Sequence, residues 1–371
     1  MRRMENIKAG FLGAGGIARS HAFALQALKF YYDQAPEVVF GSVCSATEQK
    51  REKFAGQFGF AKAEAEDQFF RNEGVNAVFI LGPNQVHFEH LERALKMPGV
   101  RFIYLEKPVC ASFEEEQAMW KLLDTIRPDV KVQVGFQFLQ STAVREALNF
   151  WKTGVLGKPI HFDLKYYHSD YLRLSYREKR RTRLAPAPEG GAMADLGSHG
   201  ISLLLAFFGS QLQITHAMQG GHFEDVPDCS DLFSSIALRD PGTGAAGHLS
   251  ASRISSGTGD LVDLEIYAEK GSLRYSTHDP DSFRFYLEET GQWVTRHVGS
   301  NYKPVVSFPS GHVPPGWLRA LVHAHYLFLG GSDEKAFIPD LKHGLEVQRL
   351  VRETAGHLTV YRNQVNKDGS K

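Results

Sequence analysis

The chain has 371 residues, and its 42 lysine and arginine residues equal its 42 aspartate and glutamate residues in number. This balance gives no reason to expect nucleic acid or an anionic membrane as a partner. The three cysteines, Cys44, Cys110 and Cys229, lie far apart and form no CxxC pair. We therefore predict neither a disulfide framework nor a metal site, and we expect a cytoplasmic location. The longest apolar run, residues 201–208, is too short for a membrane span, which takes about 20 residues.

A chain of this length exceeds the roughly 250 to 300 residues at which a single hydrophobic core stops growing, so we expect two domains. Over the first third, short apolar runs alternate with amphipathic stretches, from IKAGFL at residues 7–12 to VKVQVGF at residues 130–136. This alternation predicts βαβ units and a doubly wound parallel sheet. The first predicted domain occupies residues 1–135.

Beyond residue 135 the pattern changes to strand-like runs joined by Gly, Asp and Pro turns. After an amphipathic stretch at residues 143–154, these runs occupy residues 160–168, 212–220, 232–239, 247–254, 262–275, 282–289 and 292–298. Such a succession predicts one large, mostly antiparallel sheet. Two further amphipathic stretches, residues 316–331 and 343–358, predict helices. The second predicted domain is an α/β domain over residues 136–371.

A glycine-rich turn follows the first predicted strand and precedes the first helix. Its G-x-G-x-x-A pattern consists of Gly13, Gly15 and Ala18, and it includes Gly16 and Ile17. The first glycine permits a tight turn, the second lets the backbone approach a pyrophosphate, and the small third residue lets the helix pack closely. The pyrophosphate would lie at the helix N-terminus, where free N–H groups favour an anion. A plain tight turn is the alternative, but the strand before and the helix after favour dinucleotide binding by a Rossmann domain.

The end of the second predicted strand bears on the choice between NAD and NADP. An NAD site usually carries an acid here, about 20 residues after the glycine turn, that binds the ribose 2′-hydroxyl. This chain has Ser45 in that place, followed by Thr47, Lys50 and Arg51. Hydroxyls and cations suit a 2′-phosphate, which an acid would repel, so we favour NADP while NAD remains possible. The alternative is that Lys50 and Arg51 form only the solvated first turn of a helix.

Further motifs follow in order along the chain. ILGPNQVHFEH begins at residue 80, YLEKPVC at residue 104, GGAMADLGSH at residue 190 and FIPDLKHGLEVQRLV at residue 337. With GFLGAGGIA, they resemble the opening fingerprint, the TPNxxH segment, the EKP motif, the GGGxxxDxGxH motif and a late segment of the glucose-fructose oxidoreductase and inositol dehydrogenase family, Gfo/Idh/MocA. In that late segment a short strand leads to a helix that carries a glycine. The resemblance spans nearly the whole chain.

The resemblance implies a Rossmann domain followed by an α/β domain with a large open sheet, with the nicotinamide and the active site at their junction. It implies that Lys107, Asp195 and His199 form the catalytic set. We also expect Glu106 to shape the turn that aims Lys107, and His87 to begin a helix rather than to do chemistry. Family members commonly pair through the open sheet face, so a homodimer or homotetramer is expected. The expected cofactor contacts after the second strand are Gly82, Pro83, Asn84, His87, Glu106 and Lys107.

The chemistry of these side chains agrees with the resemblance. Oxidation of a carbinol needs a base for the hydroxyl proton, a cation near the developing alkoxide and a hydride acceptor at the same carbon. His199 suits the acid/base role, Lys107 can polarise the oxygen, and Asp195 can orient the imidazole or bind a second hydroxyl. Each residue also has a structural alternative, since Asp195 could cap the helix, His199 could be a satisfied core histidine, and Lys107 could be solvated.

The sequence defines the substrate side less sharply. Arg183 resembles part of a WRL element that precedes the glycines, so we expect it to bind substrate hydroxyls or a carboxylate. Gln137 stands near the position at which the family often has an arginine. Tyr166 and His168 end a strand that either faces the site or belongs to the core. Ser202 stands where the third motif continues with an acid in the family. We expect the glycines of GGAMADLGSH to let the chain approach the substrate.

These observations predict an NAD(P)-dependent oxidoreductase that acts on a carbinol or ketone of a sugar, cyclitol or related polyol. One alternative is a glycosidase of the same fold that retains its nicotinamide cofactor and uses transient oxidation. Another is a cofactor-sensing regulator without chemistry, although such a protein would be expected to lose the lysine and the histidine.

Overall fold

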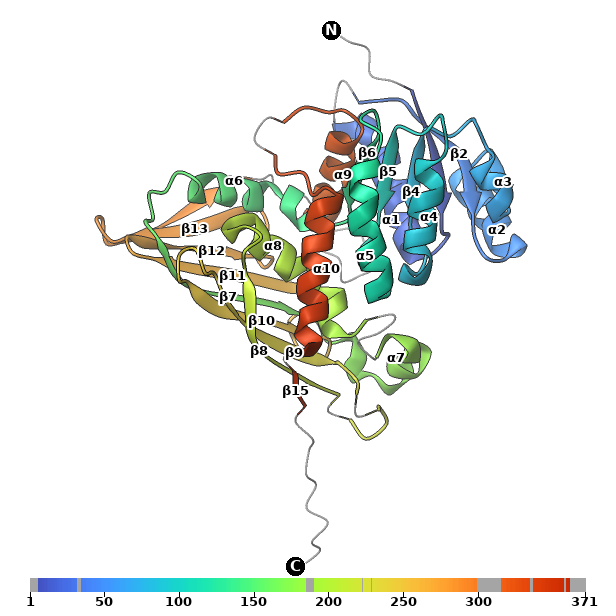
Figure 1. Ribbon diagram of the computed structural model, residues 1–371. Helices are drawn as coiled ribbons and strands as arrows, with labels where there is room; N and C mark the ends of the chain where they lie inside the picture. Colours follow the sequence, from blue (N-terminus) through green and yellow to red (C-terminus); the bar gives the residue numbers. More distant parts are fainter. Residues whose placement is uncertain are drawn as a thin grey trace, which may run out of the picture.

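The computed structural model describes residues 6–31, 35–184, 190–221, 223–227, 229–298, 315–333, 336–356 and 358–360. Two β-sheets lie side by side, and helices α9 (Pro315–Phe328) and α10 (Leu341–Gly356) run between them (Figure 1). The first third of the chain forms the smaller sheet, and the rest forms the larger one. No helix within the ranges given above is long and apolar enough to cross a bilayer.

The first sheet has six parallel strands in the order β3-β2-β1-β4-β5-β6. Strand β4 is buried along its whole length, as expected for a sheet with helices on both faces. The strand order reverses between β1 and β4, and ligands of such sheets bind outside the carboxyl ends of the strands at this point. The predicted doubly wound sheet is confirmed. Its strands are β1 (Ile7–Leu12), β2 (Val38–Cys44), β3 (Lys62–Glu64), β4 (Ala77–Ile80), β5 (Phe102–Leu105) and β6 (Lys131–Val134).

The helices that connect these strands begin and end at residues suited to the task. Ser112 caps α5, because its hydroxyl accepts a hydrogen bond from Glu115 N at 3.2 Å. Gly59 ends α2 in the left-handed region, with φ of 78°. The helices are α1 (Gly16–Tyr31), α2 (Glu48–Phe58), α3 (Glu66–Phe70), α4 (His87–Leu95) and α5 (Phe113–Leu122), with 3₁₀ turns at Asn84–Val86 and Leu123–Thr125.

The second sheet has nine strands in the order β14-β13-β12-β11-β7-β10-β9-β8-β15. Neighbouring strands are antiparallel except in the pairs β7 with β10 and β8 with β15, so the predicted mostly antiparallel sheet is confirmed. Its strands are β7 (Pro159–Tyr167), β8 (Gln213–Gly220), β9 (Phe233–Arg239), β10 (Ala246–Ser252), β11 (Leu261–Ala268), β12 (Gly271–Ser276), β13 (Ser282–Leu287), β14 (Gln292–His297) and β15 (Leu358–Val360).

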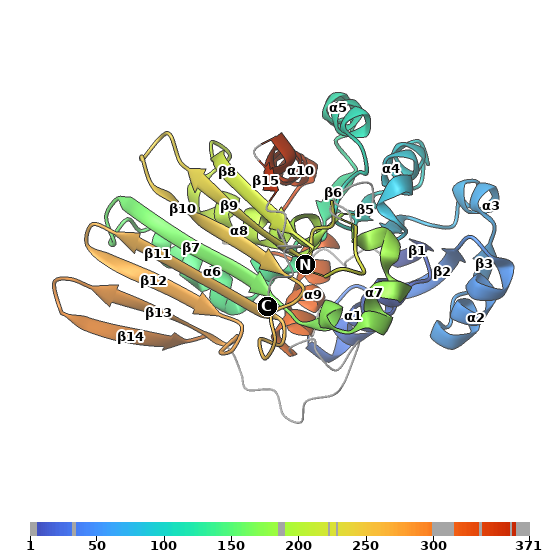
Figure 2. The same cartoon turned by 90° about the horizontal axis from the view of Figure 1, so that it is seen from below.

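Helices cover one face of this second sheet. Helices α6 (Thr142–Trp151), α8 (Ser198–Phe208) and α10 pack on that face, whereas α7 (Leu174–Lys179) lies beside the sheet. Figure 2 looks toward the opposite face, which carries no helix in the described part of the chain. Aromatic rings pair there, as His161 stacks on Tyr267 and Tyr286 packs against Trp293. Further short turns are Gln137–Gln140, Asp170–Leu172 and Arg181–Arg183, which are 3₁₀, and the π-helical turn Met193–Gly197.

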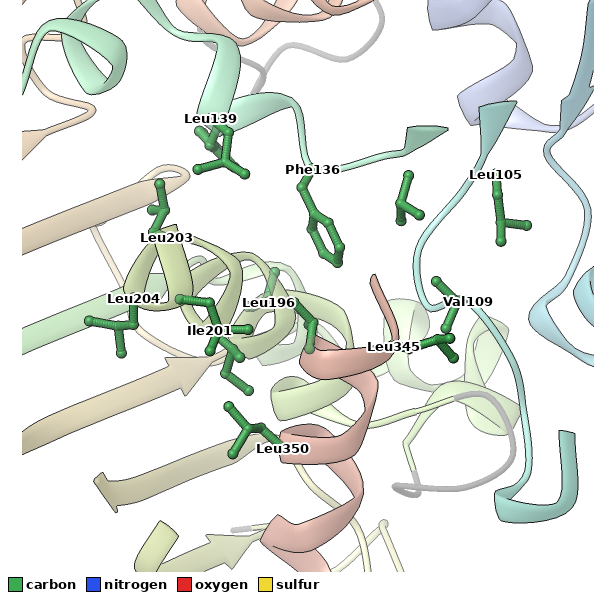
Figure 3. Close-up of a cluster of buried hydrophobic side chains, with 14 of the residues drawn as sticks. Leu105, Val109, Phe136, Leu139, Leu196, Ile201, Leu203, Leu204, Leu345 and Leu350 are labelled. Carbon is green, nitrogen blue, oxygen red and sulfur yellow. The ribbon is translucent and has the colours of Figure 1, made fainter. Parts of the chain in front are cut away.

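The core between the two sheets joins the halves of the molecule. Figure 3 shows Leu345 and Leu350 of α10 between α8 and the segment that carries Val109. Gly344 permits this approach, because a Cβ there would lie 2.9 Å from side-chain carbons of Val109 and Val134. The glycine that the sequence places in this helix therefore has a packing role.

Helix α9 packs on the first sheet although it follows the second in the chain. Leu321, Val322 and Phe328 belong to the same buried cluster as the β1 residues Ile7 and Phe11. The domain division at residue 135 coincides with the end of the first sheet and stays a prediction, since α9 returns to that sheet.

One expected element is not formed. The resemblance suggested a short strand before the last helix, but residues 336–340 have no strand structure. They make a single ladder-like contact with the edge strand β6, in which Val134 N donates to Pro339 O at 3.0 Å. Proline lacks an N–H, so it cannot return a second bond to β6.

Candidate active site

A cavity of about 200 Å³ lies at the carboxyl edge of the first sheet, where that sheet meets the second one. Its walls come from the segments that follow β5 and β6, from β7, from the start of β11 and from the helical segments α1, α8, α9 and Met193–Gly197. This is the place where ligands of open α/β sheets bind. The lining residues are Ile17, Glu106, Lys107, Gln137, Phe138, Tyr166, Asp195, Leu196, His199, Asp260 and Trp317.

The glycine turn lies at the entrance to α1 and has the form that the sequence predicts. Gly13 has φ of 131°, and a Cβ there would lie 2.6 Å from the backbone of Leu81, so only glycine fits. Around Gly15 and Gly16, in contrast, a Cβ would meet no atom within 4 Å. The open space lies at the helix N-terminus, where Gly16 begins α1 and the next residue, Ile17, already lines the cavity. A pyrophosphate therefore has room and N–H donors there.

The end of β2 carries the residues that we predict to select the 2′ group of the ribose. Ser45 follows the last residue of β2, and its hydroxyl donates to Thr47 O at 3.3 Å. Lys50 is exposed on the first turn of α2. The Arg51 guanidinium makes one ion pair in the described structure, at 3.8 Å to the exposed Glu48, and its Nε has no partner there. The Arg51 side chain is 15% exposed, so its remaining guanidinium donors are only partly accessible to a ligand.

His87 joins two segments that we predict to contact the cofactor. It is the first residue of α4, as predicted, and it is buried. Its ring nitrogens lie 2.7 Å from Pro108 O and 3.0 Å from Gly82 O. His87 therefore fixes the segment after β4 against the one after β5. Of the other residues in this segment, Asn84 is buried and Pro83 is exposed.

Glu106 holds the turn from which Lys107 projects. Its carboxylate lies 2.8 Å from His21 Nε2 and accepts from Lys107 N at 3.2 Å. The other ring nitrogen of His21 lies 2.7 Å from His325 Nε2, so α1, α9 and the end of β5 are joined through one buried contact chain. A Cβ at Gly135 would meet Glu106 Oε1 at 2.9 Å. The expected shaping role of Glu106 is consistent with this packing.

Lys107 and Asp195 meet across the junction, 88 residues apart in the sequence. Lys107 Nζ donates to Asp195 O at 2.7 Å and to Asp195 Oδ1 at 2.8 Å. The two side chains are 14% and 19% exposed, so Lys107 is not a solvated residue. Its ammonium is held at the wall of the cavity, because both bonds direct it there.

Asp195 is surrounded by cations rather than placed as a helix cap. Its Oδ2 accepts from Arg253 Nη2 at 2.8 Å, and Arg183 Nη2 lies 3.5 Å from its Oδ1. Burial alone would raise the pKa of Asp195, but Lys107, Arg183 and Arg253 together hold it well below its ordinary value. Asp195 is therefore a permanent anion whose oxygens bind cations, and it makes no hydrogen bond with the Nδ1 of His199, which has no partner in the described residues.

His199 lines the cavity from the first turn of α8 and is buried among aromatic rings. The ring centroids of Phe136, Phe138 and Tyr166 lie 5.3 to 5.9 Å from its own. Burial and then the charge of Lys107 lower the pKa of His199 well below its ordinary value, against a smaller opposite effect of Asp195. The imidazole is thus uncharged at neutral pH and is not a satisfied core histidine.

Gly191, which precedes Asp195 in the chain, approaches Asp231 rather than the cavity. A Cβ at Gly191 would lie 2.2 Å from Asp231 Cβ, and Asp231 Oδ2 accepts from Met193 N at 2.9 Å. Gly190 has φ of 81°. The expectation that these glycines let the chain approach the substrate is therefore wrong for Gly191. It lets the buried Asp231 hold the turn that carries Asp195.

The remaining predicted substrate residues are placed unequally. Tyr166 and Gln137 line the cavity. In the amide orientation that satisfies both groups, Gln137 donates to Gly135 O and accepts from Trp317 Nε1. Arg183 Nη2 lies 3.5 Å from Asp195 Oδ1, the oxygen that Lys107 also bonds. His168 Nδ1 accepts from Asp170 N at 3.2 Å. Neither Arg183 nor His168 is part of the described lining.

Sequence reasoning missed several residues of this site. Arg253 follows β10, is fully buried and lies 4.7 Å from the Tyr171 ring centroid. Its only sequence signal is a cation that ends an alternating strand. Asp260 follows a Gly-Thr-Gly stretch and therefore reads as an ordinary turn residue. Trp317 reaches the cavity from α9, which the sequence places far away.

The fold and the site are those of an oxidoreductase with an NAD-binding Rossmann fold, and comparison with known proteins agrees. Residues 7–136 match the model of an oxidoreductase family with an NAD-binding Rossmann fold. Residues 144–274 match the GFO/IDH/MocA C-terminal domain. The chain belongs to the Gfo/Idh/MocA oxidoreductase family.

Named relatives show how far the similarity extends. The levoglucosan dehydrogenase of Pseudarthrobacter phenanthrenivorans is 21% identical over 93% of this chain and 94% of that protein. The glucose-6-phosphate 3-dehydrogenase of Bacillus subtilis is 27% identical over 55% of this chain and 54% of that protein. A solved structure of levoglucosan dehydrogenase in complex with NADH and levoglucosan matches with a TM-score of 0.79 and 20% identity, over 95% of this chain and 97% of that one. The predicted family, fold and enzyme class are confirmed.

Proposed function

We propose that the protein transfers hydride between a nicotinamide cofactor and a carbinol or ketone of a sugar, cyclitol or related polyol. The observation that carries the proposal is the convergence of Lys107 Nζ, held by Asp195, and an uncharged His199 on one cavity beside the glycine turn. The named relatives that act on sugars support the same substrate class. The cavity's polar groups suit a polyhydroxylated molecule.

The side chains divide the work in oxidation as follows. Lys107 binds the reacting oxygen and stabilises the negative charge that develops on it. The uncharged His199 accepts the hydroxyl proton, and in the reverse reaction it returns that proton to the alkoxide. Asp195 positions Lys107 and balances its charge, because both its backbone oxygen and its carboxylate accept from Lys107 Nζ.

The cofactor fits the residues present. The open space at Gly15 and Gly16 leaves room for a pyrophosphate, and Ile17 places the start of α1 against the cavity. When bound, the nicotinamide supplies the hydride acceptor or donor. The segment held by His87, which includes Gly82, would flank it.

The preferred cofactor is NADP. Ser45 and Thr47 offer hydroxyls at the end of β2, and Arg51 and the exposed Lys50 offer cations to a 2′-phosphate. We predict that NADPH binds about tenfold more tightly than NADH, which fluorescence titration measures. Arg51→Met should remove most of this preference, because it weakens NADPH binding and leaves NADH binding nearly unchanged. Lys53→Met, an exposed lysine of the same helix, is the matched control. Tighter binding of NADH by the unmodified protein contradicts the preference.

One assay tests the reaction itself. Formation and consumption of NADPH and NADH are followed against D-glucose, levoglucosan, myo-inositol and their keto forms. We expect turnover that changes the cofactor's redox state with at least one of them. Hydrolysis of glycosides without net cofactor reduction would identify a glycosidase instead. Tight cofactor binding without any turnover would identify a sensor.

We further propose a cytoplasmic homodimer or homotetramer that pairs through the face of the second sheet without helices. Support comes from the outward aromatic side chains on that face, such as Tyr267 and Trp293. Light scattering measures the mass. A monomer at micromolar concentration would contradict this assembly.

A further inference from the structure

The wall of the cavity opposite the first sheet carries a second carboxylate, Asp260. It immediately precedes β11, whose first residue, Leu261, pairs with Tyr167 on β7. The neighbouring Tyr166 also lines the cavity, and its hydroxyl lies near enough to Asp260 to lower the pKa of that carboxyl. Thr277 Oγ1 donates to Asp260 O at 2.9 Å and anchors the backbone. Three strands thus hold Asp260 in place.

The surroundings of Asp260 and Asp195 are opposite in charge. Asp195 has three cations around it, whereas no ion pair involves Asp260 in the described part of the chain. The charged groups that face Asp260 are the carboxylates of Asp170 and Asp195. Burial, followed by these two charges, raises the pKa of Asp260 to about 7, against the hydrogen bond from Tyr166. Two carboxylates in one cavity whose pKa values are pushed apart have different tasks.

The other polar groups of the cavity either have partners within the protein or are the ones that we propose to act on the reacting hydroxyl, Lys107 and His199. Lys107 donates to Asp195, and the amide of Gln137 is engaged by Gly135 O and Trp317 Nε1. A carboxylate accepts about four hydrogen bonds, so Asp260 keeps acceptor capacity after it binds the Tyr166 hydroxyl. A buried carboxylate whose hydrogen-bonding capacity is only partly used destabilises the folded protein, because its desolvation is not fully compensated. A ligand that donates hydrogen bonds would satisfy it.

We propose that Asp260, positioned by Tyr166, is a substrate-binding residue whose carboxylate accepts a hydrogen bond from a hydroxyl of the substrate other than the one that reacts. The enzyme therefore selects polyhydroxylated substrates over analogues that lack this second hydroxyl. This inference rests on the proposed function and adds a residue that recognises a second hydroxyl of the substrate.

The ionisation of Asp260 gives the selection a pH dependence. Only the carboxylate form is a pure acceptor, so kcat/KM should rise as the pH increases through about 7. His199 and Asp195 do not account for such a rise, because their pKa values lie well below ordinary and both have completed their titration at lower pH. Tyr166 stays protonated, since burial and the charge of Asp260 raise its pKa well above the usual value.

The test uses Asp260→Asn, which keeps the size of the side chain and removes its ionisation, with whichever compound of the sugar and polyol panel is turned over. We expect KM to rise about 10- to 100-fold, because a hydrogen bond to a charged group is lost, while kcat changes less than threefold. The rise of kcat/KM through pH 7 should disappear. Tyr166→Phe should raise KM about three- to tenfold and keep the pH dependence, because the carboxylate remains.

Monodeoxy derivatives of the same compound locate the second hydroxyl. The derivative that lacks it should lose about 10- to 100-fold in kcat/KM with the unmodified enzyme and almost nothing with Asp260→Asn, since the two changes remove the same bond. Asp263→Asn, on the same strand but paired with the exposed Lys165, is the matched control and should change neither parameter. Cofactor affinity and melting temperature show that each variant is folded.

The outcomes separate this inference from the function on which it rests. Failure of the unmodified enzyme to turn over any member of the panel overturns both. Turnover with an unchanged KM and an unchanged pH profile in Asp260→Asn overturns the assignment of Asp260 alone. A loss confined to kcat would also overturn it, because that result describes a residue of the reacting centre rather than one that reads a second hydroxyl.

Discussion

The two walls of the cavity are built by different physical means. On the side of the first sheet, backbone conformation sets the geometry. Gly13 has a positive φ, and the Glu106 carboxylate holds the turn by accepting a hydrogen bond from the backbone N–H of Lys107. On the side of the second sheet, charged side chains set it: Arg253 and Asp195 pair at 2.8 Å, and Asp260 faces no cation in the described residues. One wall depends on local backbone geometry, and the other depends on ion pairs between residues that are far apart in the sequence.

This difference determines how each wall should fail. A change in the backbone-determined wall should act on the cofactor or on local strain, and it should depend little on pH. A substitution in the charged wall leaves the other member of an ion pair buried without its partner. The loss in free energy of unfolding should therefore include the desolvation of that remaining charge, and it should vary with pH. Lys107 belongs to both walls, because it projects from the first sheet and bonds Asp195.

Replacement of Lys107 should therefore have the largest effect. Lys107→Met should lower kcat by about 10³-fold, equivalent to about 4 kcal/mol, because the charge near the developing alkoxide is lost. Steady-state kinetics measure the loss, and titration should show cofactor affinity within about twofold of that of the unmodified enzyme. Lys96→Met, an exposed lysine paired with Glu92, is the matched control. A kcat within tenfold of the unmodified value would remove Lys107 from the catalytic set.

Replacement of Arg253 should have the next largest effect, and on stability. Arg253→Met leaves buried Asp195 without its 2.8 Å partner, and removal of one partner of a buried pair costs about 3 kcal/mol. Because Asp195 has a depressed pKa in the folded protein, its contribution to stability is present above its ordinary pKa of 3.8 and is lost as the pH falls through the folded value. The difference between the two proteins should therefore narrow below pH 3.8.

Denaturant unfolding at several pH values measures this difference. Arg173→Met is the matched control, because Arg173 makes the same kind of contact at 3.0 Å with Asp170 but is 62% exposed. Exposed ion pairs contribute less than about 1 kcal/mol, so this variant should differ little. Equal losses in the two variants, or a difference that is constant with pH, would show that Arg253 acts by packing alone.

The same contrast explains what the sequence predicted. The first sheet and the glycine turn follow from patterns local to about 30 residues, the length of one βαβ unit. His87 begins α4 as predicted for the same reason. The short strand expected before the last helix is not formed, because Pro339 has no N–H with which to return a second hydrogen bond to the edge strand β6. The second sheet was predicted as a type, but its two parallel pairs were not, because pairing across the chain leaves no local trace.

The site was predictable where a motif holds it and not where strands meet. Lys107, Asp195 and His199 belong to motifs, and the structure places all three at one cavity. Arg253 and Asp260 become part of the site only because β10 and β11 flank β7, an arrangement that no local pattern encodes. The role first considered for Asp195, orientation of His199, came from their spacing, and its three cationic partners lie 12, 58 and 88 residues away. Spacing within a helix cannot reveal partners at such separations.

The smallest predicted effects concern the glycine turn, where Gly13 is needed for the backbone conformation and Gly15 for the space that we assign to the pyrophosphate. Gly13→Ala should destabilise the protein by about 2 kcal/mol, because its Cβ would lie 2.6 Å from Leu81 backbone and φ is 131°. Gly15→Ala should change stability by less than about 0.5 kcal/mol, since no atom lies within 4 Å of its Cβ, yet it should weaken cofactor binding about tenfold because it fills space meant for the pyrophosphate. Thermal unfolding without cofactor and titration with NADPH measure the two effects separately. If Gly15→Ala binds NADPH as tightly as the unmodified enzyme, the open space at this turn does not hold the pyrophosphate, and the turn then serves only to bend the chain.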